Sequence, residues 1–171
     1  MTEEVKAKTY ADFVIPSGVV TRIDVAHLLS ELEWVDNELT TATVRVKAGA
    51  EQQAKPSVSG VLEEFLTSND LKIDSSSARS DLIKQVRLLK DKVPVIHMTF
   101  AVTADQESLQ ELIAWLRTSI HPQAVISVGI QPALVAGVYL RTPNHVHDLS
   151  MRAVLKKSRG ILTKELEALR G

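Results

Sequence analysis

The residue types most able to do chemistry gather late in the chain, in the run His145-Val146-His147-Asp148. In an extended strand, side chains two residues apart point to the same side, so His145 and His147 could share a metal ion. Zinc sites normally use three or four protein ligands, and the nearby sequence offers no evident third ligand. Polar residues are also expected here without a metal, because the run follows a Pro-Asn turn. The pattern therefore favours exposed turn histidines, and we expect no metal site.

The other candidates for catalysis are one strand histidine and pairs of carboxylates. His97 lies in the apolar run VIHMTF, where a lone histidine is more often a core or interface residue than a base. Glu63 and Glu64 are adjacent, but charges on an amphipathic helix normally form its solvated face. The sequence has neither a Gly-x-Gly-x-x-Gly nor a Gly-Lys-Ser/Thr loop for phosphate, and no cysteine. We expect no catalytic residue and no cofactor.

The net charge and the lengths of the apolar stretches indicate which kinds of partner the protein could bind. The chain has 20 basic and 21 acidic side chains, a net charge of -1, so no overall field attracts nucleic acid or anionic lipid. A basic cluster (Arg152, Lys156, Lys157 and Arg159) lacks neighbouring aromatic residues and suits an acidic protein partner at least as well as RNA. The start has no signal-peptide pattern, and the longest apolar stretch is interrupted by a glutamine, a proline and two glycines. We expect any membrane association to run through partners.

The first half of the chain has apolar residues at helical spacing. This spacing predicts helices over residues 25–39, 58–66 and 82–93. The expected start signals are Thr21 with Asp24, Ser57, and the serine run 75–77, and the expected stops are Asn69 and Pro94. Residues 47–60 have few large apolar groups, which predicts an exposed, mobile, protease-sensitive loop. Phe13, Val14 and Ile15 precede a proline and a glycine and are expected to pack as an irregular cover.

The second half has short β-branched runs instead. Strands are predicted over 95–102, 124–130 and 134–142, followed by a Pro143-Asn144 turn into a fourth segment, 146–150. Between the first two strands, Thr103 and Gln106 have capping-box spacing for a helix whose buried stripe extends to Ile120. A long final helix is expected from residue 151. The predicted fold class is therefore α+β. An α-helical, bundle-like domain (1–93) precedes a small α/β domain (94–171) with a short mixed sheet and a terminal helix.

One C-terminal stretch has a more specific pattern. In IQPALVAGVYLRTPNHVHDLSMR, a proline-led turn and strand end in an arginine, and a polar hairpin leads into an Asp-x-Ser-x-Arg segment. This order resembles the C-terminal signature of the delta subunit of F-type ATP synthases, the oligomycin-sensitivity-conferring protein of mitochondria. The resemblance covers residues 95–169, and Tyr10-Ala11 is similar to the family's N-terminal start. The positions that carry it are Pro132, Leu134, Gly137, Arg141, Asp148, Ser150 and Arg152.

Physical reasons for these residue types stand beside the resemblance. A glycine within a strand suggests that another backbone approaches closely, so a larger residue at position 137 should clash. Asp148 and Ser150 can accept hydrogen bonds from the first N–H groups of a following helix. Arg141 and Arg152 could pair with Asp148. A tight strand-turn-helix junction alone would require such residues, so they are structural or partner-binding.

The resemblance implies a non-catalytic stator component. In that family the N-terminal helices grip alpha subunits of the catalytic head, and the C-terminal domain holds the b-subunit stalk. It thus implies peripheral association with the cytoplasmic face of a bacterial membrane, with no nucleic acid and no small-molecule substrate as partner. The sequence departs from the family at Gln131, where an aspartate is usual, and in the interrupted helices of its first half, which indicates a divergent bacterial member.

A second hypothesis comes from a different class of protein. The strands and helix of the second half could form a small cytosolic metabolite-binding or regulatory module, with a cleft near His97 or His147. Stabilisation by a ligand would distinguish this module from the stator component.

Overall fold

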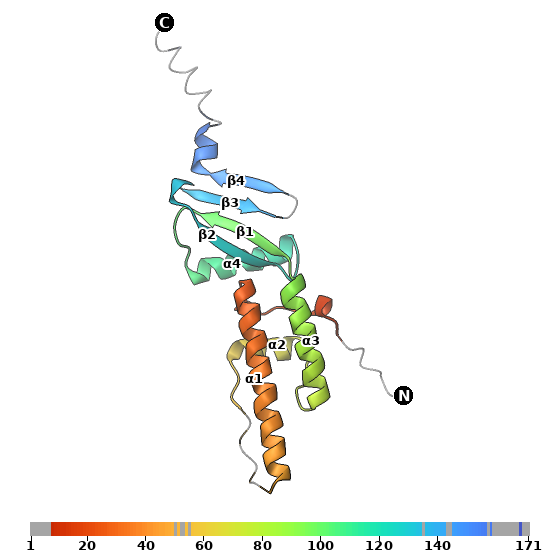
Figure 1. Ribbon diagram of the computed structural model, residues 1–171. Coiled ribbons are helices and arrows are strands. Elements are labelled where there is room, and N and C mark those ends of the chain that lie inside the picture. Colours follow the sequence, from red (N-terminus) through yellow and green to blue (C-terminus); the bar gives the residue numbers. More distant parts are fainter. Residues whose placement is uncertain are drawn as a thin grey trace. The chain divides into compact units, whose positions relative to one another are not determined.

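The computed structural model describes residues 8–49, 51, 54, 56–134, 136–142, 145–156, 158 and 168. Helices occupy the first half of the chain and a four-stranded sheet the second, so the fold is α+β, as predicted (Figure 1). The chain forms two compact units, one of residues 1–94 and 113–125, the other of residues 95–112 and 126–171. Residues 113–125 belong to the first unit although they lie beyond the domain boundary predicted near Pro94.

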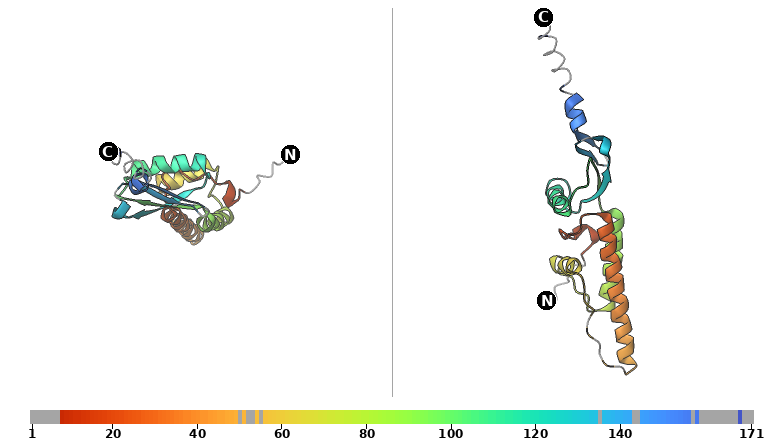
Figure 2. Two further views of the ribbon diagram at one scale, coloured as in Figure 1. Left: turned by 90° about the horizontal axis from the view of Figure 1, so that it is seen from above. Right: turned by 90° about the vertical axis from the view of Figure 1, so that its left-hand side faces the viewer.

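The first unit contains the helices α1 (Arg22–Lys47), α2 (Gly60–Ser68) and α3 (Ser76–Lys92), preceded by the 3-10 turn η1 (Tyr10–Asp12), and it also includes residues 113–119 of α4 (Gln106–Ser119). α1 and α3 lie side by side, and α2 crosses one face of this pair (Figures 1 and 2). The predicted apolar stripes of α1 and α3 face the core because residues three and four apart share one face of a helix, whereas Val61 of the stripe predicted for α2 is 36% exposed. The buried stripe of α1 is Val25, Leu28, Leu29, Leu32 and Val35.

Side-chain caps fix where these helices begin. Thr21 and Asp24 form the predicted capping box of α1, in which the Asp24 carboxylate accepts the Thr21 N–H at 2.7 Å. α3 is capped by Ser75, within the predicted serine run. The cap predicted for α2 was wrong, because Ser59 rather than Ser57 begins this helix. The carboxylate of Glu31 on α1 accepts hydrogen bonds from the Ser59 N–H and Oγ, which anchors that residue.

The segment before α1 packs against α2 as an irregular cover. Phe13 and Ile15 are buried as predicted, whereas Val14 was wrongly expected to pack and is 55% exposed. The rings of Phe13 and Phe65 meet edge to face at 5.4 Å. Asn69, the predicted stop of α2, is fully buried, and its amide pairs with the backbone N–H and carbonyl of Val14 at 2.8 and 2.9 Å.

Four strands form one mixed sheet in the order β2-β1-β3-β4. β3 is antiparallel to both β1 and β4. The Val125 N–H donates to the Pro94 carbonyl, and the Gln131 N–H donates to the Phe100 carbonyl. Because the partner residue number rises along both segments, β1 and β2 are parallel. The three predicted strands are confirmed, the fourth segment is also a strand, and the Pro143–Asn144 turn lies outside the described residues. The elements are β1 (Val95–Phe100), α4 (Gln106–Ser119), β2 (Val125–Ile130), η2 (Pro132–Leu134), β3 (Gly137–Arg141) and β4 (Val146–Ser150).

The ends of α4 differ in part from the prediction. The capping box predicted from Thr103 and Gln106 was wrong, because Asp105 accepts the Ser108 N–H at 2.8 Å and the Ser108 hydroxyl at 3.0 Å. An ionised carboxylate also suits the positive end of a helix dipole, which favours Asp105 over a threonine. Ile120 lies beyond the end of α4 and is 51% exposed, so it does not extend the buried stripe.

After β4 the chain turns directly into a helix, which the structure describes over residues 151–156. The more distant leucines of the predicted final helix, at positions 162, 166 and 169, lie outside the described residues. Among the helices that the structure describes, none is both long and apolar enough to span a membrane.

Candidate functional site

Gly137 is the point of closest backbone approach in the C-terminal motif. It begins β3 opposite Ser150, with a φ of 94°, a conformation that side-chain-bearing residues rarely adopt. A Cβ atom at this position would lie 2.4 Å from the Leu149 carbonyl oxygen and 2.8 Å from the Ser150 Cα. The predicted close approach is confirmed, at the first residue of the strand.

Ser150 and Asp148 form the junction between β4 and the following helix. Ser150 is fully buried, and its Oγ accepts the Ala153 N–H at 3.2 Å, as an N-cap does. The Asp148 carboxylate accepts the Ser150 N–H at 3.0 Å. Hydrogen bonds from the Ser150 side chain and backbone, and then the nearby charge of Arg152, hold the pKa of Asp148 below its ordinary value. These contacts show how the Asp-x-Ser-x-Arg segment stabilises the junction between β4 and the following helix.

The other motif positions have separate surroundings. Pro132 and Leu134 lie in η2, where Leu134 is buried and Pro132 is exposed. Arg141 ends β3 with His97 and Val146 as its cross-strand neighbours. Within the described residues, no ion pair joins Arg141 to an acidic side chain. Its expected pairing with Asp148 is therefore not seen.

Next to the junction, apolar side chains are unusually exposed. Single exposed apolar residues are common on proteins, but a group of them marks a surface that can bind a partner. β4 is also an edge strand, and one side of its backbone is left unpaired by the sheet order. The exposed apolar segment, named here the C-terminal apolar segment, comprises Leu149, Met151, Val154 and Leu155, each 46–61% exposed, whereas Val146 is 53% exposed on the other face of β4.

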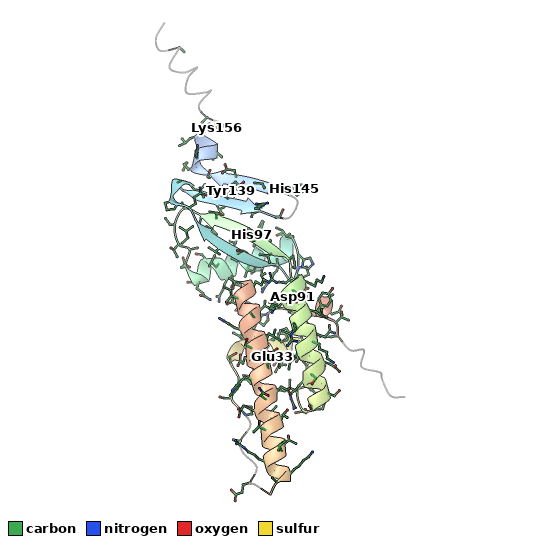
Figure 3. The ribbon with its side chains drawn as sticks, in the orientation of Figure 1. Glu33, Asp91, His97, Tyr139, His145 and Lys156 are labelled. Carbon is green, nitrogen blue, oxygen red and sulfur yellow. The ribbon has the colours of Figure 1, made fainter. Side chains whose placement is uncertain are left out.

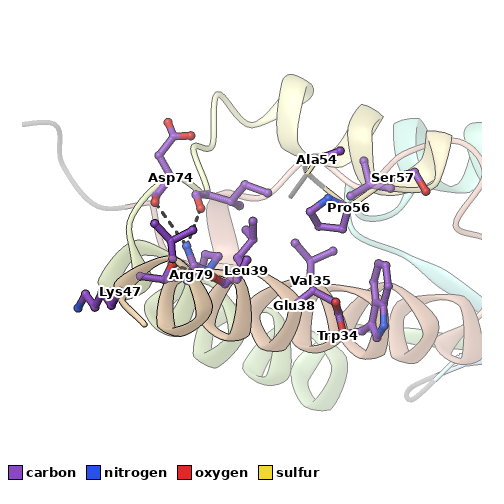
Figure 4. Close-up of a pocket in the computed structure, with 15 residues that line it drawn as sticks. Trp34, Val35, Glu38, Leu39, Lys47, Ala54, Pro56, Ser57, Asp74 and Arg79 are labelled. Carbon is purple, nitrogen blue, oxygen red and sulfur yellow. Dashed lines mark hydrogen bonds between the residues drawn. The ribbon is translucent and has the colours of Figure 1, made fainter. Parts of the chain in front are cut away.

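The first unit contains an elongated groove along the C-terminal half of α1 (Figure 4). Its volume is about 860 Å³, and its apolar wall includes Trp34, Leu39 and Val46 of α1 and Pro56 of the following loop. Trp34 and Val46 are 47% and 44% exposed. One wall of the groove is thus mostly apolar, and its exposed side chains are accessible to a partner. We name it the α1 groove.

A buried arginine side chain, Arg79, stabilises one end of the α1 groove. The Arg79 guanidinium pairs with Asp36 at 2.6 Å and donates to the carbonyl oxygens of Ile73 and Asp74, at 3.0 and 3.4 Å. Figure 4 shows the bonds to the two carbonyls. Because Arg79 is engaged with α1 and with the chain before α3, it supports the groove and is not a free ligand for a partner.

His97 lies on the exposed face of the second unit's sheet. Alternation along β1 places Ile96 and Met98 on the buried face and His97 on the other. Figure 3 labels His97 on β1 and Tyr139 on β3. A cavity of about 570 Å³ on this face is lined by Val95, His97, Thr99, Tyr139, Arg141 and Thr142. His147 pairs with Leu140, on the opposite face, so it does not reach this cavity.

The two late histidines lie near each other without completing a metal site. Their ring centres are 6.2 Å apart. Across the described part of the chain, no group of three histidine, cysteine or acidic residues has the spacing of a metal site.

Two residues that the sequence did not single out hold the N-terminal segment in place. Arg117 of α4 donates to the carbonyl oxygens of Ile15 at 3.1 Å and Pro16 at 2.8 Å, and also to those of Val19 and Ala124. Burial lowers the pKa of this guanidinium. Gln123 donates to the carbonyls of Tyr10 and Phe13, at 2.7 and 2.9 Å. Residues 113–125 therefore belong to the first unit through specific bonds.

Compared with known protein families and with curated proteins, the sequence matches none.

Proposed function

We propose that the protein is a non-catalytic adaptor of the stator type, linking the alpha/beta catalytic head of an F-type ATP synthase to its b-subunit stalk. The α1 groove would take an amphipathic helix of the head, and the C-terminal apolar segment would take the stalk. The protein would then be attached to the cytoplasmic face of the membrane through the complex. Affinity and stiffness would hold the head still while the rotor turns, in support of proton-driven ATP synthesis.

The observation that carries this proposal is the exposed apolar segment beside the C-terminal motif. Leu149 and Leu155 are 61% and 57% exposed, although the adjacent Ser150 is fully buried in a hydrogen-bonded junction. Apolar side chains held by a hydrogen-bonded junction indicate a binding surface, because the backbone that carries them is already ordered and loses little entropy when a partner binds. Three positions of the family resemblance, Gly137, Asp148 and Ser150, lie at this junction, which supports a stalk-binding role.

The α1 groove supports the second contact. Helices that bind in grooves insert apolar side chains at helical spacing, and a wall built from Trp34, Leu39 and Val46 offers apolar surface over three turns of α1. Aromatic residues such as Trp34 contribute strongly to binding when a partner covers them. This groove is the part of the first unit that best suits an amphipathic helix.

The test is a pull-down of the tagged full-length protein from solubilised native membranes, with mass spectrometry of the retained proteins. Recovery of alpha, beta and b subunits of the synthase is the expected result. A preparation that retains the bait and no synthase subunit would exclude the stator role. Truncation at Val95 is unsuitable as a variant, because it would remove Arg117 and Gln123 from the first unit.

The metabolite-binding module is a second candidate, favoured by the cavity beside His97. Its volume of about 570 Å³ is large enough for a small molecule. A module of this kind would be stabilised by its ligand and would recover no synthase subunit from membranes.

A further inference from the structure

The exposed face of the second unit's sheet brings together four side chains with hydrogen-bond donors. His97 lies opposite Arg141, and Thr99 lies opposite Tyr139, in the antiparallel pairing of β1 with β3. Residues directly opposite in such a pair have Cβ atoms about 5 Å apart on one face. The two pairs are neighbours along the strands and line one cavity.

The described part of the chain supplies no acceptor for these donors. Within the described part of the chain, no hydrogen bond or ion pair engages the side chains of His97, Thr99, Tyr139 or Arg141. By contrast, the partly buried Arg117 is bound to four backbone carbonyls. A cavity lined by unengaged donors is suited to a ligand that supplies acceptors.

The charge of the cavity selects the class of ligand. Its six lining residues include a guanidinium and no carboxylate. The nearest acidic residue by strand register is Asp148, opposite Tyr139, and its carboxylate is bound to Ser150. A guanidinium presents a planar fork of N–H donors that matches the paired oxygens of a carboxylate or phosphate.

We propose that this face of the sheet binds a small molecule through an oxyanion group, a carboxylate or a phosphate. Arg141 contacts two oxygens, and the His97 N–H and the hydroxyls of Thr99 and Tyr139 complete the shell. An imidazole has at least one N–H donor in either protonation state. Val95 gives the cavity an apolar end for the rest of the ligand. This inference is independent of the stator role.

Nuclear magnetic resonance titration of the labelled full-length protein tests the site. Sodium phosphate and sodium acetate are the probes, with sodium chloride at matched ionic strength as the reference. Saturable shifts at His97, Thr99, Tyr139 and Arg141 are expected with at least one probe, and the probe that binds more tightly identifies the oxyanion. Shifts that are no larger than those in chloride would overturn the proposal.

Substitutions distinguish specific binding at this cavity from nonspecific electrostatic attraction of anions. Arg141→Gln should weaken probe binding about tenfold or more, and Arg141→Lys should give an intermediate loss because it keeps the charge without the fork. Thr99→Val, which removes one donor without changing charge, should weaken binding by a smaller factor. Lys156→Gln makes the same charge change as Arg141→Gln on the exposed helix after β4 (Figure 3) and should leave binding within about twofold. Equal losses in Arg141→Gln and Lys156→Gln would overturn the proposal.

Discussion

At the scale of single residues, Gly137 is the position where substitution should do most harm. Gly137→Ala combines a positive φ with overlap against the Leu149 carbonyl, and it should lower the free energy of unfolding by about 2–4 kcal/mol. Urea denaturation measures this change. Gly49→Ala is the matched control, because Gly49 has a φ of 91° with open space around its missing Cβ. It should show the conformational cost alone, about 1 kcal/mol. Equal losses in both variants would contradict the proposed clash.

Asp148 gives a residue-scale prediction about pH. Its pKa is lowered in the folded protein, so its contribution to stability is complete above the ordinary aspartate pKa and is lost as the pH falls through the lowered value. A carboxyl titration by nuclear magnetic resonance should find the lowered pKa. Ser150→Ala removes the largest cause and should move the pKa of Asp148 back towards the ordinary value.

Asp105 is the internal control for this titration. Its pKa is lowered in the same direction by the backbone and side chain of Ser108. Ser150→Ala should leave Asp105 unchanged. A pKa of Asp148 that does not respond to this substitution would contradict the proposed junction.

At the scale of elements, the prediction concerns the bonds from α4 to the N-terminal segment. Arg117→Met leaves the carbonyls of Ile15, Pro16 and Val19 without their donor. The first unit should lose about 2–4 kcal/mol of stability, because unsatisfied polar groups near the core are costly. Hydrogen exchange of residues 13–20 should accelerate more than exchange in β3. Arg87→Met is the control, since Arg87 pairs with Glu33 at 2.6 Å on the exposed surface and should cost less than about 1 kcal/mol. Similar losses in both variants would contradict the role assigned to Arg117.

Some of these elements and contacts could be predicted from the sequence, and others could not. Periodicity identified α1, α3 and the strands, because local spacing determines which face is buried. The start of α2 was missed because it depends on Glu31, which is 28 residues away from Ser59. Arg117 was missed for the same reason, since its carbonyl partners Ile15 and Pro16 lie about a hundred residues earlier. The contact at Gly137 was predictable because a glycine in a strand often marks a close approach of a second backbone.

The cavity beside His97 was only partly predictable. The sequence indicated a cleft near His97 or His147, but the register between β1 and β3 decides which residues share a face. That register places Arg141 beside His97, whereas the sequence suggested that Arg141 pairs with Asp148. Strand pairing between distant segments was the missing information.

At the scale of the whole molecule, each unit would bind one partner. In the stator proposal, the α1 groove holds the alpha subunit and the C-terminal apolar segment holds the b subunit. Trp34→Glu should therefore weaken retention of alpha, and Leu149→Glu should weaken retention of b. Each substitution places a charge at a residue that is 47% or 61% exposed, so folding should be little affected.

The most direct test compares these two variants in the membrane pull-down, with full-length tagged protein and quantitative mass spectrometry. Ile23→Glu and Val102→Glu are the controls, since both residues are exposed, at 65% and 71%, and lie outside the two proposed surfaces. We expect retention of alpha relative to b to fall about tenfold or more in Trp34→Glu, and retention of b relative to alpha to fall as much in Leu149→Glu. Neither control should change. Retention of both subunits at control levels in both variants, or recovery of neither by the unmodified protein, would contradict the stator role.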